Sequence, residues 1–131
     1  MARLPDRVGI DQQDLDAITR TALDYLEGFV LADPDRHLSS YHPEAVKRRF
    51  AQDQDGIFWV NAISPRTMAD YAAVETPAET PHEIVIDAVY DDIASVRVYS
   101  NRWVDFLHIV KARGEWKLFH VTWQNRDITI E

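Results

Sequence analysis

Residues 103–125 read WVDFLHIVKARGEWKLFHVTWQN and carry the clearest structural pattern in the sequence. Two runs rich in β-branched and aromatic residues, Trp103–Ala112 and Trp116–Asn125, flank the short polar break at Arg113-Gly114. A break this short predicts an antiparallel hairpin, because a parallel crossover needs roughly a dozen or more residues. The end of the chain is therefore expected to form two neighbouring strands of a sheet.

The tip of this hairpin sets the expected register. If Ala112 pairs with Glu115, counting outwards places Leu107 opposite His120 and Asp105 opposite Thr122. The first face then carries Trp103, Asp105, Leu107, Ile109, Trp116, Leu118, His120 and Thr122. The second face carries Val104, Phe106, His108, Val110, Lys117, Phe119, Val121 and Trp123.

Both faces of this hairpin are largely apolar, whereas a sheet with one wet face alternates between apolar and polar residues. Helices can cover one face, so the other needs a different cover. We expect a homodimer through the sheet face that carries Val104, Phe106, Val121 and Trp123, since twofold dimers are common. The alternative is that the N- and C-terminal tails cover this face.

Further strands are expected upstream. Glu83–Tyr90 and Ala94–Ser100 extend the hairpin into a meander, and Asp91-Asp92 marks the turn between them. Two shorter runs, Ala45–Phe50 and Ile57–Ala62, predict another pair of strands.

The first half of the chain has helical patterns. Apolar residues from Leu15 to Val30 recur at steps of three and four, as on an amphipathic helix, with Asp11 as N-cap and Pro34 ending it. Asp33-Pro34 begins a short helix to about Tyr41, and Ser64-Pro65 begins a third through Ala72. Helices followed by a meander predict an α+β fold.

Length and charge narrow the class of protein. A chain of 131 residues is expected to be a single domain, with its core at about residues 11–126. The net charge of −8 opposes binding to nucleic acids and to anionic membrane surfaces. Residues 1–6 lack the apolar run of a secretion signal, and no stretch approaches a membrane span, so we expect a cytoplasmic protein. The absence of cysteine excludes a disulfide framework and a thiolate nucleophile.

Four segments carry a resemblance to a known family. They are residues 24–28 (DYLEG), 38–45 (LSSYHPEA), 103–107 (WVDFL) and 114–118 (GEWKL). In this order they resemble the nuclear-transport-factor-2-like (NTF2-like) superfamily, and in particular its putative lumazine-binding branch. The resemblance implies a cone, in which a curved antiparallel sheet wraps around a long N-terminal helix and two shorter helices. It also implies a pocket at the open end and dimers formed through the sheet.

Asp105 is the first candidate for chemistry. A carboxylate among Trp103, Leu107 and Ile109 should have a raised pKa, which suits a general acid or base near neutral pH. The resemblance supports this choice, because Asp105 matches the aspartate of the branch's strand motif. The structural alternative is an aspartate held by Arg102, Arg48 or backbone donors.

Two further polar residues are grouped with Asp105. His120 falls on the same face in the expected register and could shuttle a proton, although a lone histidine on an apolar strand is often only a hydrogen-bonded core residue. Tyr25 on the long helix is a candidate hydrogen-bonding partner. Five residues are candidate pocket walls that could equally be core packing, namely Tyr41, His42, Trp59, Tyr71 and Trp103.

No cofactor is expected, because the four glycines form no phosphate-binding loop. No metal is expected either, since the five histidines have no compact ligand spacing. We therefore expect a small-molecule pocket protein that binds an apolar or aromatic ligand or catalyses proton transfer on one, of the isomerase, dehydratase or cyclase type. The alternative is a noncatalytic structural or protein-interaction module that works through its sheet face.

Overall fold

The computed structural model describes residues 10–126, and its helices begin at the predicted caps. They are α1 (Gln12–Val30), α2 (Pro34–Ser39) and α3 (Pro65–Ala73). The side chains of Asp11, Asp33 and Ser64 each accept a hydrogen bond from a backbone N–H in the first turn of the helix that follows. Within the described residues, none of the helices is long and apolar enough to cross a membrane.

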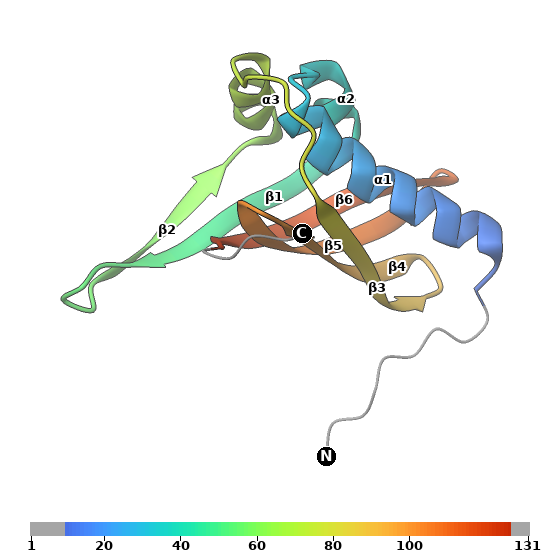
Figure 1. The fold of residues 1–131 in the computed structure, drawn as a ribbon. Coiled ribbons are helices and arrows are strands. Elements are labelled where there is room, and N and C mark those ends of the chain that lie inside the picture. Colours follow the sequence, from blue (N-terminus) through green and yellow to red (C-terminus); the bar gives the residue numbers. More distant parts are fainter. Residues whose placement is uncertain (1–9, 127–131) are drawn as a thin grey trace.

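The strands form one curved, open sheet (Figure 1). They are β1 (Tyr41–Gln52), β2 (Phe58–Ile63), β3 (His82–Tyr90), β4 (Ile93–Ser100), β5 (Trp103–Ala112) and β6 (Glu115–Asn125). Their order across the sheet is β2-β1-β6-β5-β4-β3. The predicted α+β cone is confirmed, with the long helix α1 lying across one face of the sheet (Figure 1).

One pairing differs from the expected antiparallel sheet. β1 runs parallel to β6, with Lys47 opposite Val121, so the sheet is mixed. These two strands are far apart in the sequence, and no tight turn dictates their direction. A hydrogen bond of 2.8 Å from the Leu118 N–H to the Ser40 carbonyl joins the start of β1 to β6.

The core lies between α1 and the face of the sheet that it covers, which we call the inner face. Ile18, Ala22 and Leu26 from α1 pack into this core, and Leu107 and Leu118 meet them from the sheet. The predicted inward face of β5 is confirmed, because Asp105, Leu107 and Ile109 are all buried.

The predicted register of the hairpin is wrong beyond its first few pairs. Ala112 pairs with Glu115 as expected, but a β-bulge between the pairs Ile109–Leu118 and His108–His120 adds Phe119 as an extra residue. Asp105 therefore lies opposite Trp123, not Thr122. This shift turns Val121 and Trp123 into the core and His120 and Thr122 outwards.

The opposite face, which we call the outer face, is not covered by any described segment. Val104, Phe106 and His108 lie on it as expected, and Phe106 is 53% exposed. Val121 and Trp123, which we expected there, belong to the inner face. The terminal tails that could also have covered this face lie outside the described residues.

β1 and β2 continue beyond the rest of the sheet as a projecting arm (Figure 1). Phe50 and Phe58 stack on one side of the arm, with ring centroids 5.1 Å apart. Trp59 pairs with Ala51 and is half-exposed. The base of the arm, at Asn61–Ile63, returns to the body of the molecule, where α3 begins.

Candidate functional site

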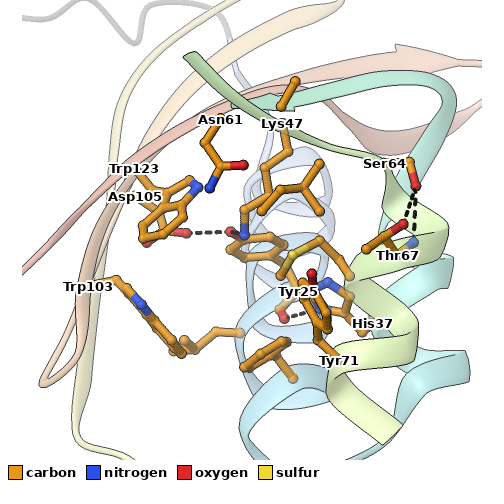
Figure 2. Close-up of a pocket in the computed structure, with 15 residues that line it drawn as sticks. Tyr25, His37, Lys47, Asn61, Ser64, Thr67, Tyr71, Trp103, Asp105 and Trp123 are labelled. Carbon is orange, nitrogen blue, oxygen red and sulfur yellow. Dashed lines mark hydrogen bonds between the residues drawn. The ribbon is translucent and has the colours of Figure 1, made fainter. Parts of the chain in front are cut away.

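A pocket of about 420 Å³ opens on the inner face beside α1 and α3. Its walls come from α1, α2, α3, the base of the β1–β2 arm, and strands β5 and β6 (Figure 2). The apolar part of the lining includes Leu26, Phe29, Ile63, Met68 and Trp103. The polar part includes Tyr25, His37, Lys47, Asn61, Thr67 and Asp105. A mostly apolar wall with a few convergent polar groups is typical of small-molecule sites.

A buried chain of three polar side chains forms one wall. The Tyr25 hydroxyl donates a short hydrogen bond to the Asp105 carboxylate. The Lys47 ammonium donates to the same hydroxyl at 2.6 Å, so Tyr25 links the cation to the anion (Figure 2). Asp105 is only 6% exposed and Lys47 only 5%. Two charged groups this deeply buried are rare unless they are paired.

Burial shifts the acid–base properties of all three groups. It raises the pKa of Asp105 above its ordinary value, although Lys47 and the Tyr25 hydroxyl partly oppose the shift. It lowers the pKa of Lys47 to about 8, against the attraction of Asp105. Burial, with the nearby Asp105 charge, also raises the pKa of Tyr25. The acid and the amine therefore exchange a proton more easily than the same groups would in water.

His37, from α2, makes a hydrogen bond that fixes the position of Tyr25. Its Nδ1 lies 2.6 Å from the Tyr25 carbonyl, which can only accept, so Nδ1 carries the proton and donates. Its Nε2 then accepts from the Tyr41 hydroxyl at 3.1 Å. Burial lowers the pKa of His37 to about 4, so the ring is neutral at neutral pH. The ring therefore fixes the place of Tyr25 without adding charge.

Gly28 allows α2 to approach α1 closely enough for this arrangement. A Cβ atom at residue 28 would lie 2.5 Å from the His37 backbone nitrogen and 2.7 Å from its Cα. Gly28 therefore makes room for the backbone of α2, and through it for His37.

Four of the sequence candidates meet in the pocket. Tyr25, Tyr71, Trp103 and Asp105 all line it. Tyr71, on α3, is 51% exposed and stands at the mouth. Tyr41 lies one layer behind, with its ring 5.9 Å from that of Tyr25.

Three candidates lie elsewhere. His120 is on the outer face, where its ring lies 5.8 Å from that of His108, so the predicted pairing of His120 with Asp105 in one cavity is wrong. The bulge at Phe119 is the cause. His42 packs against Phe119, and Trp59 lies further out on the arm.

Neither of the two arginines proposed to hold Asp105 structurally is among the groups that act on its carboxylate. Arg102 pairs with Glu75 and stacks over Trp103 at 4.1 Å. Arg48 lies opposite Thr122 of the neighbouring strand β6, on the outward-facing side of β1. The partners of Asp105 are Tyr25 and Lys47.

Four of the polar or aromatic residues that line the pocket were not predicted from the sequence, namely Lys47, His37, Asn61 and Trp123. Lys47 belongs to the run Lys47-Arg48-Arg49, and lysine and arginine side chains are mostly exposed to solvent. Strand alternation separates Lys47 from Arg48, but it does not reveal which of the two faces inwards. The expected register places Trp123 on the outer face, and the bulge at Phe119 reverses this placement.

One donor in the pocket wall has no partner. The Trp123 Nε1–H is buried and makes no hydrogen bond within residues 10–126. A buried N–H without a partner is costly, so this group would gain from an acceptor on a bound molecule. No cluster of three or more metal-ligating side chains occurs among the described residues.

Comparison with known proteins supports the same fold. An NTF2-like protein of unknown function from Methylobacillus flagellatus is 18% identical, with a TM-score of 0.75, over 92% of this chain and 98% of that one. An NTF2-like protein of unknown function from Shewanella baltica is 19% identical, with a TM-score of 0.69, over 87% and 94%. A ketosteroid isomerase-like protein from Erwinia carotovora is 16% identical, with a TM-score of 0.64, over 88% and 98%.

A match to a sequence family covers most of the chain. No curated protein matches the sequence significantly. Residues 13–124, however, match the family described as putative lumazine-binding, and this range contains every residue of the pocket. With the fold and the pocket in place, the chain belongs to this family within the NTF2-like superfamily.

Proposed function

We propose that this protein holds an apolar or aromatic small molecule in the inner-face pocket and that Asp105 exchanges a proton with it. The observation that carries the proposal is the Asp105 carboxylate, buried in the pocket wall and hydrogen-bonded to Tyr25. A carboxyl group with a raised pKa is suited to proton transfer near neutral pH. The reaction class is cofactor-independent isomerisation, dehydration or cyclisation.

The surroundings of Asp105 support this role. Aromatic rings from Trp103, Trp123 and Phe29 offer flat surfaces for an aromatic ligand. The Lys47 ammonium uses one of its three donors on the Tyr25 hydroxyl, and its positive charge can stabilise negative charge that develops on the ligand. The family description names lumazine, a small aromatic molecule, which agrees with a pocket of this kind.

The test uses an activated ketone, 2-tetralone, whose α-hydrogens exchange with solvent. Proton NMR in D₂O would follow α-deuteration, and quenching of tryptophan fluorescence would follow binding. We expect the parent protein to bind the ketone and to accelerate exchange. Asp105→Asn should keep binding but lose exchange by about 10²–10⁴-fold, because it removes the titrating group while keeping its shape.

A matched control is Asp87→Asn. Asp87 is likewise a β-strand aspartate, and its carboxylate pairs with Arg97 at an N–O distance of 2.7 Å, but it lies outside the pocket. This variant should exchange the ketone at the parental rate. Absence of ligand binding by the parent would contradict the pocket proposal, and full exchange by Asp105→Asn would remove Asp105 from the mechanism.

A second proposal concerns the outer face, which we infer is the contact surface of a homodimer. Its exposed apolar side chains include Val46, Ile93 and Phe106, and monomers rarely leave a large apolar patch in water. A hollow of about 350 Å³, lined in part by Tyr90, His108 and Phe119, would receive side chains from a partner. The same surface supports the alternative in which the protein acts only as an interaction module.

A further inference from the structure

Lys47 is the most unusual group in the pocket. The chain has three lysines, Lys47, Lys111 and Lys117, and of these only Lys47 lines the pocket. Its ammonium lies 4.8 Å from the centroid of the Tyr25 ring and 5.6 Å from that of Trp123. A lysine needed only for solubility would keep its ammonium in water, because long charged side chains normally extend to the surface.

We propose that the Lys47 amine captures the carbonyl group of an apolar aldehyde or ketone as an imine. This inference rests on the proposed function, because the carbonyl compound must first enter the same pocket. It adds a substrate class, carbonyl compounds, and a covalent step to that function. Imine formation by a lysine desolvated in an apolar site is an established mode of nucleophilic catalysis.

The hydrogen-bonded chain provides a route for the first proton. The Lys47 ammonium donates a proton to the Tyr25 hydroxyl as that hydroxyl passes its own proton to the Asp105 carboxylate. The result is a neutral amine and a neutral carboxylic acid. Burial shifts the equilibrium towards this neutral pair, since it raises the pKa of Asp105 and lowers that of Lys47 to about 8.

The covalent step then balances without a further reagent. The nitrogen lone pair of Lys47 forms a bond to the carbonyl carbon, and one proton of the amine moves to the carbonyl oxygen to give a carbinolamine. The C–O bond then breaks, and the oxygen leaves as water after taking the proton that Asp105 had accepted. In total, one ammonium and one carbonyl give one protonated imine and one water.

The pocket also provides a donor for the carbonyl oxygen. The Trp123 Nε1–H is buried in the wall without a partner among residues 10–126. An oxygen that accepts from it would satisfy this donor and polarise the carbonyl bond. Figure 2 shows the Trp123 ring and the Lys47 ammonium on the same side of the pocket, near Asp105.

The two other lysines serve as internal controls. Lys111 pairs with Asp14 at 3.1 Å, and Lys117 donates to the Ser39 carbonyl at 2.7 Å. The lowered pKa of Lys47 increases the share of its amine that is neutral at pH 7.5, and of the three lysines only Lys47 lines the pocket that would hold the aldehyde. At limiting reagent, modification should therefore favour Lys47.

The experiment incubates the folded parent protein with 2-naphthaldehyde at pH 7.5 and traps any imine with sodium cyanoborohydride. Intact mass measures the extent of addition, and peptide mapping assigns the modified lysine. 2-Naphthalenemethanol, which has the same ring system but cannot form an imine, measures noncovalent binding through tryptophan fluorescence. Lys47→Arg keeps the positive charge and Lys47→Met keeps the length of the side chain, while neither can form the imine.

The expected result is a reduced adduct on Lys47 in the parent and none in either variant at this residue. Adducts spread equally over Lys47, Lys111 and Lys117, or found only on the latter two, would overturn the inference. Because this readout uses the parent alone, it remains decisive if a variant fails to fold. If the alcohol binds but Lys47 stays unmodified, the imine is refuted while the pocket proposal stands. If neither compound binds, both proposals fail.

Discussion

His37 shows how a buried residue can hold a site in place while remaining neutral. It donates to the Tyr25 carbonyl and accepts from the Tyr41 hydroxyl, so both ring nitrogens are used. Protonation would require Nε2 to give up its role as acceptor inside an apolar environment. The position of Tyr25, and so of the chain to Asp105, depends on the neutral ring.

This arrangement predicts a loss of stability in mild acid. The pKa of His37 is lowered to about 4 in the folded protein, so between pH 6.5 and 4 the unfolded chain binds a proton that the folded one does not. Stability from this residue is therefore lost as the pH falls. From pH 7 to pH 5 the loss is about 2 kcal/mol.

Urea unfolding of the parent and of His37→Gln at both pH values measures this loss. The glutamine amide can donate and accept but cannot titrate, so the parent should lose about 2 kcal/mol more than the variant. Equal losses in the two proteins would show that His37 does not carry the effect.

Among individual residues, the sequence identified Asp105 and its partner Tyr25 but missed Lys47 and His37. A single carboxylate between Trp103 and Leu107 on an apolar strand is conspicuous, and Tyr25 lies on the apolar stripe of its helix. Lys47 precedes two arginines, so the sequence does not show that it is the buried residue of the three. The contacts of His37 join residues from three elements. Such contacts depend on tertiary packing, which no local pattern encodes.

Among the elements, the contact between α1 and α2 depends on Gly28. Alanine at residue 28 would gain about 1 kcal/mol of helix propensity. Its Cβ, however, would lie 2.5 Å from a backbone atom of His37, so α2 would have to move. Overpacking against backbone costs about 1–3 kcal/mol and here outweighs the gain.

We therefore predict that Gly28→Ala is destabilised by up to about 2 kcal/mol in urea unfolding. The displaced His37 should also weaken ligand binding in the pocket. An alanine variant more stable than the parent would contradict the close approach of the two helices.

The elements themselves were largely predictable, and the bulge was not. Local signals include helix caps such as Asp11 and Ser64 and the turn at Arg113-Gly114. The structure confirms the helices and strands that begin or end at these signals. The extra residue at Phe119 follows no such signal, because both faces of β6 offer apolar residues in either register. That one residue moved His120 out of the site and Trp123 into it.

For the molecule as a whole, the outer face, which no segment within residues 10–126 covers, predicts self-association. Phe106→Glu would place a charge in the middle of this face. The charge would be solvated in the monomer, but it would lose its water in a dimer contact and so destabilise the dimer. Sedimentation at micromolar concentration should show a dimer for the parent and a monomer for this variant.

Val74→Glu is the matched control, because Val74 is exposed but follows α3, away from the sheet. It should remain a dimer. A parent protein that sediments as a monomer would contradict the outer-face contact.

The parallel pairing of β1 with β6 could not be predicted from the sequence, because it is decided by residues far apart in the chain.

The most direct measurement of the central claim is the titration of Asp105 itself. ¹³C NMR of the carboxyl carbons, with Asp105→Asn used to assign its signal, would give its pKa in the free protein and with 2-naphthalenemethanol bound. We expect Asp105 to have a pKa above the ordinary aspartate value, because burial outweighs the opposing effects of Lys47 and Tyr25, and we expect its signal to shift when the ligand enters. A carboxyl that titrates at or below the ordinary value and does not respond to a bound ligand would contradict it.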